Sequence, residues 1–361
     1  MNPNSISSRK VDHLRLCAED EVEARQKTNL LDDLELFHDS LPEVHVDEID
    51  LSTEFLGKPL SAPLLITGMT GGASEASRIN RDLAHIAQEF GLAFGVGSQR
   101  AMSKDPSLTA TYSVREVAPD IPLLGNLGAV QAAAMSTAEA QDLVEAIGAD
   151  ALCIHLNPGQ ELIQPEGDRD FRGCLDGIRR LHDELPVPLI IKETGCGLSP
   201  SVLDRLQEVG ISWVDTSGAG GTTWIGVEAR RAPDAAAELG ELFWDWGVPT
   251  AAAIVYAHRR GFSIIGSGGL RTGLDAARAL AIGADIAGMA LPWLRAAYDD
   301  GEEGARGFAR RCLSALRTAL ALTGSQDLAA FRQTPRIIGP RLQRWIDADQ
   351  SSTGAPRSTR T

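Results

Sequence analysis

The chain is 361 residues long, with 43% hydrophobic and 23% charged residues, which excludes a disordered or fibrous chain and indicates a globular protein. Its 49 acidic and 34 basic side chains give a formal net charge of −15, so its overall field repels nucleic acids and anionic membrane surfaces. No apolar run is long enough to span a membrane and the first residues lack the apolar stretch of a signal peptide, so we expect a cytoplasmic protein.

The five cysteines, at positions 17, 153, 174, 196 and 312, contain no C-x-x-C pair and do not have the spacing of a small secreted domain. We therefore expect reduced thiols rather than disulfides. This expectation agrees with a cytoplasmic location.

Residues 1–62 carry mixed charge without a clear alternation of strands and helices. We predict that they form an arm or cap that packs on the following domain and contributes substrate contacts. At the other end, the polar residues 349–361 are expected to form a disordered tail. The predicted folded domain is therefore 63–348.

From residue 63 onward, short apolar runs alternate with turn formers and amphipathic segments. The runs are rich in branched apolar residues, as expected of strands buried on both faces. Alternating strands and helices indicate a parallel sheet, and eight such units match a closed (β/α)8 TIM barrel better than an open doubly wound sheet. The predicted strands lie within residues 63–69, 93–98, 122–129, 150–157, 188–195, 211–218, 262–269 and 285–292.

The segments between the runs have helical periodicity and helix-ending signals. After the first run, Ile79, Leu83 and Ile86 recur on one helical face and Gly91 follows as a stop signal. The segment "STAEAQDLVEAIGAD" begins with capping hydroxyls and has Gly148 at its far end. These segments are predicted to be the helices of the barrel.

Polar residues collect at the carboxyl ends of the predicted strands. The loops that follow barrel strands build one active face, so these residues are predicted to bind ligand or take part in catalysis. They are Thr67, Gly68, Met69, Thr70, Ser98, Gln99, Arg100, Asn126, His155, Asn157, Gln160, Glu161, Lys192, Glu193, Ser217 and Thr222.

Two glycine-rich stretches, "DTSGAGGTTW" (215–224) and "GSGGLRTG" (266–273), follow late strands. Glycines there can turn backbone N–H groups toward an anion at a helix N-terminus, where barrels of this class bind phosphate. Tight turns without a ligand are the alternative for each glycine alone. Because the clusters converge, we favour a phosphate site.

A series of motifs runs along the chain in order: "RKVDH", "TGMTGG", "GVGSQR", "NLGA", "HLNPGQE", "QPEGDRDFRG", "KETGCG", "DTSGAGGTTW" and "GSGGLRTGLDAARALAIGAD". Together they resemble the type 2 isopentenyl-diphosphate isomerases, FMN-bound barrels related to the α-hydroxy acid oxidases and dihydroorotate dehydrogenases. The resemblance extends from Arg9 to about Pro292, and its most specific parts are "HLNPGQE" and the N-terminal "RK". Gly159 and Ala219 depart from the family pattern and affect the expected shape of the pocket.

The resemblance implies FMN as cofactor, with NADPH or NADH as reductant. A role for Lys192 in binding FMN also has a physical reason, because a cation beside the N1/O2 edge stabilises the anionic reduced flavin. Judged alone, Lys192 would form a salt bridge to Glu193. The implied FMN contacts are Thr67, Gly68, Met69, Thr70, Ser98, Asn126, Lys192, Ser217, Thr222, Gly268, Gly269, Leu270, Arg271, Ala290 and Leu291.

The implied substrate carries a diphosphate, which an acidic chain must bind with a local cluster of cations. By itself, "RKVDH" is typical of a solvated charged stretch, and only the resemblance favours a binding role. Glu161 is the implied Mg²⁺ ligand, because Mg²⁺ favours one or two carboxylates together with phosphate oxygens and water. The implied substrate contacts are Arg9, Lys10, His13, Ser98, Gln99, Arg100, His155, Asn157 and Gln160.

The implied reaction is the 1,3-allylic proton shift between isopentenyl and dimethylallyl diphosphate, a step of isoprenoid biosynthesis. The reduced flavin, through its N5 atom, is the implied acid and base, supported by His155, Gln160 and Trp224. For His155 a satisfied core histidine is the alternative, and for Trp224 simple packing. The resemblance also implies a homotetramer or octamer.

Three other functions are possible from the residues. An FMN oxidoreductase of the α-hydroxy acid oxidase type needs a base, usually histidine, after a late strand. No histidine lies between 183 and 257, and His258 falls in a predicted helix, which disfavours this alternative. An aldolase-like barrel would use Lys192 as a Schiff base and be colourless. A binding module without catalysis is disfavoured by the many polar strand ends.

Overall fold

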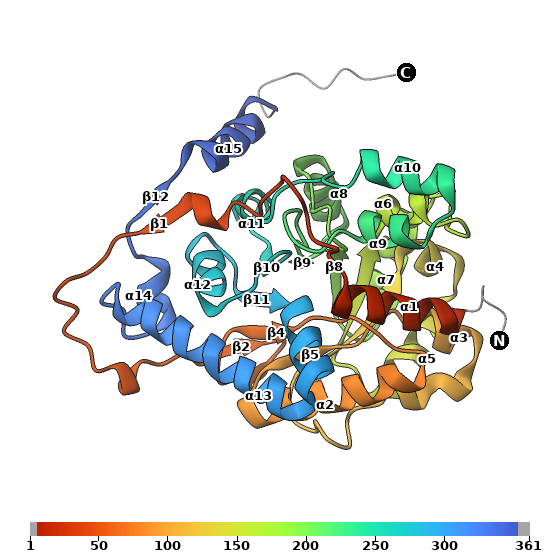
Figure 1. Cartoon of the computed structure of the whole chain (residues 1–361), viewed down its shortest axis with the longest axis horizontal. Coiled ribbons are helices and arrows are strands. Elements are labelled where there is room, and N and C mark those ends of the chain that lie inside the picture. The colour runs from red at the N-terminus through yellow and green to blue at the C-terminus, as the bar shows by residue number, and fades with distance from the viewer. Residues whose placement is uncertain (1–5, 353–361) are drawn as a thin grey trace.

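The computed structural model describes residues 6–352. Eight parallel strands close into a barrel in the order β10-β11-β4-β5-β6-β7-β8-β9, surrounded by helices (Figure 1). Each strand lies within a predicted run, so the predicted (β/α)8 barrel is confirmed. The strands are β4 (Leu64–Ile66), β5 (Ala93–Gly95), β6 (Leu123–Gly128), β7 (Ala151–Leu156), β8 (Leu189–Glu193), β9 (Trp213–Asp215), β10 (Ser263–Ser267) and β11 (Ile286–Met289).

The second helix between β6 and β7 begins and ends at the predicted capping residues. Ser136 caps its helix in a capping box with Glu139, and Gly148 ends it in a left-handed conformation. Long helix α13 contains a break at Asp300 and Gly301, where the backbone is not helical. The helices are α2 (Ser74–Phe90), α3 (Arg100–Lys104), α4 (Ala129–Ala134), α5 (Thr137–Ile147), α6 (Pro158–Ile163), α7 (Cys174–Glu184), α8 (Pro200–Val209), α9 (Trp224–Arg231), α10 (Asp234–Leu242), α11 (Thr250–Arg259), α12 (Gly273–Ala281), α13 (Leu291–Ala321) and α14 (Leu328–Arg332).

The N-terminal segment contacts both ends of the barrel. Helix α1 (Ile6–Glu19) packs against α13 and α9. A hairpin of β2 (Thr53–Phe55) and β3 (Lys58–Leu60) inserts Phe55 among residues at the amino ends of the strands, where its ring meets Trp213 edge-on at 4.9 Å. The hairpin therefore closes the amino end of the barrel, and α1 lies at the other end.

The C-terminal helix α15 (Pro340–Ser352) packs against α11, on the opposite side of the molecule from α1 (Figure 1). It follows β12 (Arg336–Ile338), which pairs antiparallel with β1 (Leu34–Leu36) of the N-terminal segment. Asp349 is buried and its carboxylate accepts from Arg260, the residue that follows α11. Residues 349–352 of the expected tail are thus helical, and 353–361 lie outside the described residues.

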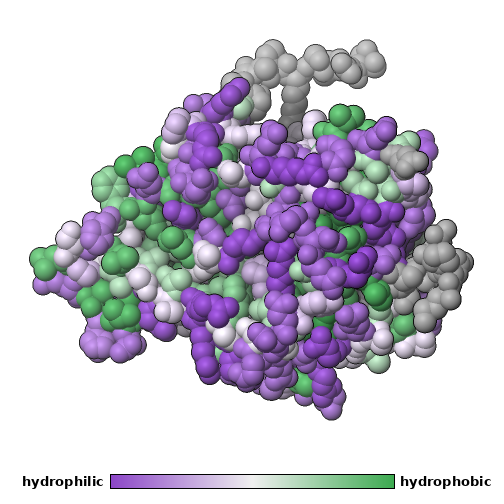
Figure 2. Space-filling model, in the orientation of Figure 1, coloured by the Kyte–Doolittle hydropathy of each residue, from purple (hydrophilic) through white to green (hydrophobic). Residues whose placement is uncertain are grey.

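The surface shown in Figure 2 is mostly hydrophilic, with hydrophobic residues gathered toward the left of the view. The segment between β1 and β2 lies on that side in Figure 1 and carries the exposed side chains of Phe37, Leu41 and Val46. No helix within residues 6–352 has the length and apolar character needed to cross a membrane. The five cysteines are free.

Candidate active site

A cavity opens at the carboxyl ends of the strands, beneath helix α1. It contains about 1260 Å³ of space free of protein atoms, including open solvent at its mouth. Most of the predicted site residues line it: Arg9, Lys10, His13, Thr67, Gly68, Met69, Thr70, Ser98, Arg100, Asn126, His155, Asn157, Gln160, Glu161, Lys192, Ser217, Thr222, Trp224, Ala290 and Leu291. Six predicted residues do not: Gln99, Glu193, Gly268, Gly269, Leu270 and Arg271.

Gln99 is fully buried behind the cavity wall. Its amide nitrogen donates to the carbonyl of Leu143 at 2.8 Å, and its amide oxygen accepts from the backbone N–H of Asn126 at 2.9 Å. The side chain therefore bridges two parts of the backbone. Its expected substrate contact has no support in the cavity geometry.

At the end of β4, the cavity is bordered by Thr70. Its hydroxyl is buried and, among the described residues, has no hydrogen-bond partner. Buried hydroxyl groups in native proteins are nearly always paired. A polar ligand in the cavity would satisfy this group.

Lys192 and Glu193 at the end of β8 do not pair through their side chains. The Lys192 ammonium donates to the carbonyl oxygen of Glu193 at 2.6 Å, and the Glu193 carboxylate accepts backbone N–H groups of residues 194–197. Burial raises the pKa of Glu193 to about 7, although these N–H groups oppose the increase. Glu193 thus holds the following loop, and Lys192 remains directed at the cavity.

His155 is held by Asn126 across the neighbouring strand. Its Nδ1 lies 2.8 Å from the Asn126 side-chain oxygen, which can only accept, so Nδ1 carries the proton and Nε2 is an acceptor. Burial, with the nearby charges of Lys192, Lys10 and Arg100, lowers the pKa of His155 to about 3. A neutral imidazole therefore faces the cavity.

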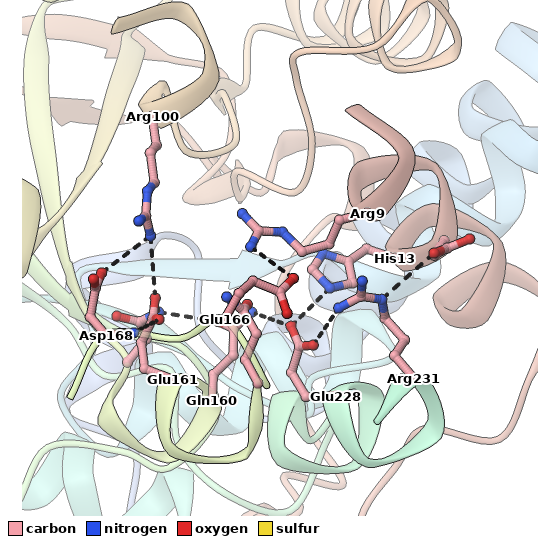
Figure 3. A network of polar contacts seen from close by, with 12 residues as sticks. Arg9, His13, Arg100, Gln160, Glu161, Glu166, Asp168, Glu228 and Arg231 are labelled. Carbon is pink, nitrogen blue, oxygen red and sulfur yellow. Dashed lines mark hydrogen bonds and ion pairs between the residues drawn. The ribbon is translucent and has the colours of Figure 1, made fainter. Parts of the chain in front are cut away.

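Three cations converge on the cavity from helices α1 and α3. Arg9 pairs with Glu166 at 3.5 Å, and Arg100 pairs with Asp168 at 3.2 Å (Figure 3). Burial, and then the charge of Arg9, lowers the pKa of Lys10 to about 8. The three cations supply local positive charge for an anionic ligand, and Glu166 and Asp168 balance part of it.

Glu161, on α6, lies beside this cationic group. Its carboxylate accepts from the Asn157 amide at 2.9 Å and from the backbone N–H of Asp168 at 2.7 Å, and Arg100 lies 3.9 Å away. No cluster of three or more potential metal-ligating side chains exists among residues 6–352. A divalent cation here would thus need ligand atoms from a substrate.

Glu228 of α9 organises the other side of the cavity (Figure 3). Its fully buried carboxylate accepts from His13 at 2.9 Å, Gln160 at 3.0 Å and Arg231 at 2.6 Å. Burial alone raises the pKa of Glu228, but these partners outweigh burial and lower it to about 2. Burial also lowers the pKa of His13, although Glu228 opposes this.

Glu228 and several residues that line the cavity were not predicted from the sequence. The only local signal for Glu228 is its position four residues after Trp224, on the same face of α9. The missed cavity residues are Leu14, Cys17, Gly97, Gln131, Gln164, Thr194 and Leu294. Gln164 lies in the quoted motif "QPEGDRDFRG", and Leu14 and Cys17 follow Lys10 at helical spacing.

The two glycine-rich loops pack directly on each other. A Cβ atom on Gly221 would lie 2.3 Å from the Cα of Gly269, so only glycine permits this approach of the two backbones. The N-terminal segment covers the loops, with Glu23 bridged to Thr222. The glycines are therefore required for the junction itself.

Arg271 lies at this junction, where its guanidinium pairs with Glu23 at 2.6 Å and approaches the Thr222 hydroxyl at 3.4 Å. Its backbone N–H donates to Asp275 in the capping box of α12. That N–H, predicted to bind phosphate, is thus committed to the helix cap. The side chain lies beside Thr222, which does line the cavity.

The two departures from the family pattern lie outside the cavity lining. A Cβ atom on Gly159 would lie 3.1 Å from Ile225 and 3.2 Å from the Cys196 sulfur, so these side chains fill the space beside it. Ala219 is buried and bridged to Pro249. Neither enlarges the cavity directly.

Comparisons with known proteins show which family the chain belongs to. The FMN-dependent dehydrogenase family model matches residues 3–110 and 120–337. An isopentenyl-diphosphate delta-isomerase of Synechococcus sp. is 48% identical, with 93% of this chain and 97% of that protein covered. Its namesake from Methanothermobacter thermautotrophicus is 44% identical, with 95% and 96% covered.

Among solved structures, a mandelate oxidase variant with a monooxide FMN adduct has a TM-score of 0.62 at 15% identity, covering 90% of this chain and 95% of that one. This likeness supports the fold alone. The family model and the two sequence relatives cover nearly the whole chain, and the motif resemblance is confirmed. The chain belongs to the FMN-dependent dehydrogenase family and to the isopentenyl-diphosphate delta-isomerases.

Proposed function

We propose that this protein interconverts isopentenyl and dimethylallyl diphosphate by a 1,3-allylic proton shift, with reduced FMN and Mg²⁺. The observation that carries the proposal is the meeting of Arg9, Lys10 and Arg100 with Glu161 above a strand-end cavity that contains Lys192. Such a cavity offers a cationic end for a diphosphate and a deeper end for a flavin. The relatives named isopentenyl-diphosphate delta-isomerase support the same reaction.

The cavity residues fit FMN. The unpartnered hydroxyl of Thr70 suits a flavin ring edge, and the buried ammonium of Lys192 suits the N1/O2 edge. Thr222, Ala290 and the nearby guanidinium of Arg271 suit a phosphate. When bound and reduced, the flavin supplies an electron-rich acid and base for the allylic shift.

Glu161 fits the metal-binding role as a single carboxylate. Mg²⁺ commonly uses one or two carboxylates, with substrate phosphate and water completing its shell. To bind Mg²⁺, the Glu161 carboxylate would have to give up its hydrogen bond from Asn157 or move away from Arg100. Glu161→Gln should therefore retain FMN while requiring a much higher Mg²⁺ concentration; unchanged Mg²⁺ dependence would rule this ligand out.

The remaining residues orient the substrate. Lys10 stays largely protonated at neutral pH, because its pKa of about 8 is still above 7, and can bind the diphosphate with Arg9 and Arg100. Glu228 fixes Gln160 by accepting from its amide nitrogen. Trp224 packs edge-on with His13 at 5.1 Å and forms an apolar wall suited to the hydrocarbon part of the substrate.

The proposal is tested with purified full-length protein. Acid should release a chromophore that migrates as FMN, and a colourless protein that takes up no added FMN would favour the aldolase-like alternative. Catalytic NADPH, NADH or dithionite should support many anaerobic turnovers, with deuterium entering the product methyl group in D₂O. Consumption of one acceptor per turnover with a 2-hydroxy acid would instead favour the oxidoreductase. The oligomeric state and the nicotinamide reductant stay predictions.

A further inference from the structure

Asp215 is a buried carboxylate beneath the cavity to which the proposed reaction gives no role. It ends β9 and is only 2% exposed. In the parallel register it lies directly opposite Lys192 of β8, so both side chains project to the same face of the sheet. Because Lys192 lines the cavity, that face is the interior of the barrel.

Asp215 also fixes the backbone beside the cavity through one intermediate residue. Its carboxylate accepts a hydrogen bond from the Ser267 hydroxyl, and the Ser267 oxygen accepts from the backbone N–H of Ser217 at 3.2 Å. Ser217 has a φ of 36°, in the left-handed region that non-glycine residues rarely adopt. Such a conformation persists only where surrounding contacts impose it. The two hydrogen bonds that link Asp215 to Ser217 through Ser267 are such contacts.

The charge of Lys192 acts on the Asp215 carboxyl. Burial raises the pKa of Asp215, while the Lys192 ammonium, the Ser267 hydroxyl and the Ser217 N–H oppose the increase. Lys192 makes its direct hydrogen bond to the Glu193 carbonyl, which is uncharged. Asp215 is therefore the carboxylate that faces Lys192 inside the barrel.

We propose that Asp215 is a positioning residue of the flavin site: its negative charge offsets that of Lys192, and through Ser267 it fixes the backbone of Ser217. The inference rests on the proposed binding of FMN near Lys192. The reduced flavin is anionic, so Lys192 favours it and Asp215 opposes it. Asp215 thus keeps the reduction potential of the bound flavin lower than Lys192 alone would set it.

The test is a spectroscopic redox titration of the full-length holoprotein carrying Asp215→Asn. The amide keeps the size of the side chain and its oxygen can still accept from Ser267. Removing the charge should shift the reduction equilibrium about tenfold toward the reduced flavin, which is about 30 mV more positive for a two-electron couple. Glu54→Gln removes one negative charge from an exposed position and should leave the potential unchanged.

Ser267→Ala separates the two roles. It keeps the Asp215 charge but removes the link to Ser217, so FMN should dissociate several-fold more readily while the potential changes little. A wild-type potential in FMN-loaded Asp215→Asn overturns the proposed charge role, and unchanged FMN affinity in Ser267→Ala overturns the backbone role. Failure of the wild type itself to bind FMN overturns the proposed function instead.

If Asp215→Asn does not fold, variants of Lys192 test the same charge interaction through the potential of bound FMN. Lys192→Met should lower the potential of bound FMN, because the favourable cation is lost and Asp215 is left behind. The double variant Lys192→Met/Asp215→Asn should return toward the wild-type potential, since it removes both the cation that raises the potential and the anion that lowers it. A double variant with the potential of Lys192→Met alone would overturn the proposal.

Discussion

Replacement of Glu228 by glutamine should reduce the free energy of unfolding of the protein at neutral pH. The pKa of this buried carboxylate falls from 4.5 to about 2 in the folded protein, which corresponds to about 3 kcal/mol of folding free energy at neutral pH. Because the folded pKa is lowered, this contribution is present above pH 4.5 and is lost as the pH falls toward 2. His13 is mostly neutral at pH 7, so its hydrogen bond to Glu228 is weaker than one from a charged imidazole. The lower limit of the expected loss of folding free energy is therefore about 2 kcal/mol.

The measurement is urea unfolding of wild type and Glu228→Gln at pH 7 and at pH 3. The free energy of unfolding should differ by about 2 to 3 kcal/mol at pH 7 and by clearly less at pH 3. Glu54→Gln, at an exposed position, serves as the control and should differ from wild type by less than about 0.5 kcal/mol. A loss at Glu228 no larger than that of the control, or one equal at both pH values, would refute the reasoning.

Three further predictions concern other parts of the molecule. Gly159→Leu should reduce the free energy of unfolding by about 1 to 3 kcal/mol in urea, because Ile225 and Cys196 fill the space beside Gly159, and Ile225→Ala in the same chain should recover part of the loss. Phe55→Ala should cost about 3 to 5 kcal/mol by thermal or urea unfolding, since the ring fills the amino end of the barrel; a loss below about 1 kcal/mol would contradict this. Arg100→Ala should weaken binding of the diphosphate substrate, measured by calorimetry, about ten- to a hundredfold, and unchanged affinity would place the anion elsewhere.

The strands and helices of the barrel could be predicted from the sequence because their signals are local. A run such as Leu64–Ile66 is buried on both faces and is therefore continuously apolar, and the helix that begins after Ser136 carries its own capping box. Strand order then follows from the alternation of strands and helices. Most of the predicted site residues line one cavity, because the carboxyl ends of parallel barrel strands meet at one face.

The direction and partners of single side chains depended on tertiary packing. Gln99 follows a strand like its neighbour Ser98, yet it turns behind the cavity wall to satisfy two backbone groups. Glu228 meets His13 across 215 residues and Gln160 across 68, a convergence that no local pattern encodes. The sequence by itself determined the repeated barrel units and the chemical types at their ends, because hydrophobic periodicity and capping act over a few residues. Only the closed barrel decided which buried charges face one another, because that choice depends on contacts between segments distant in the chain.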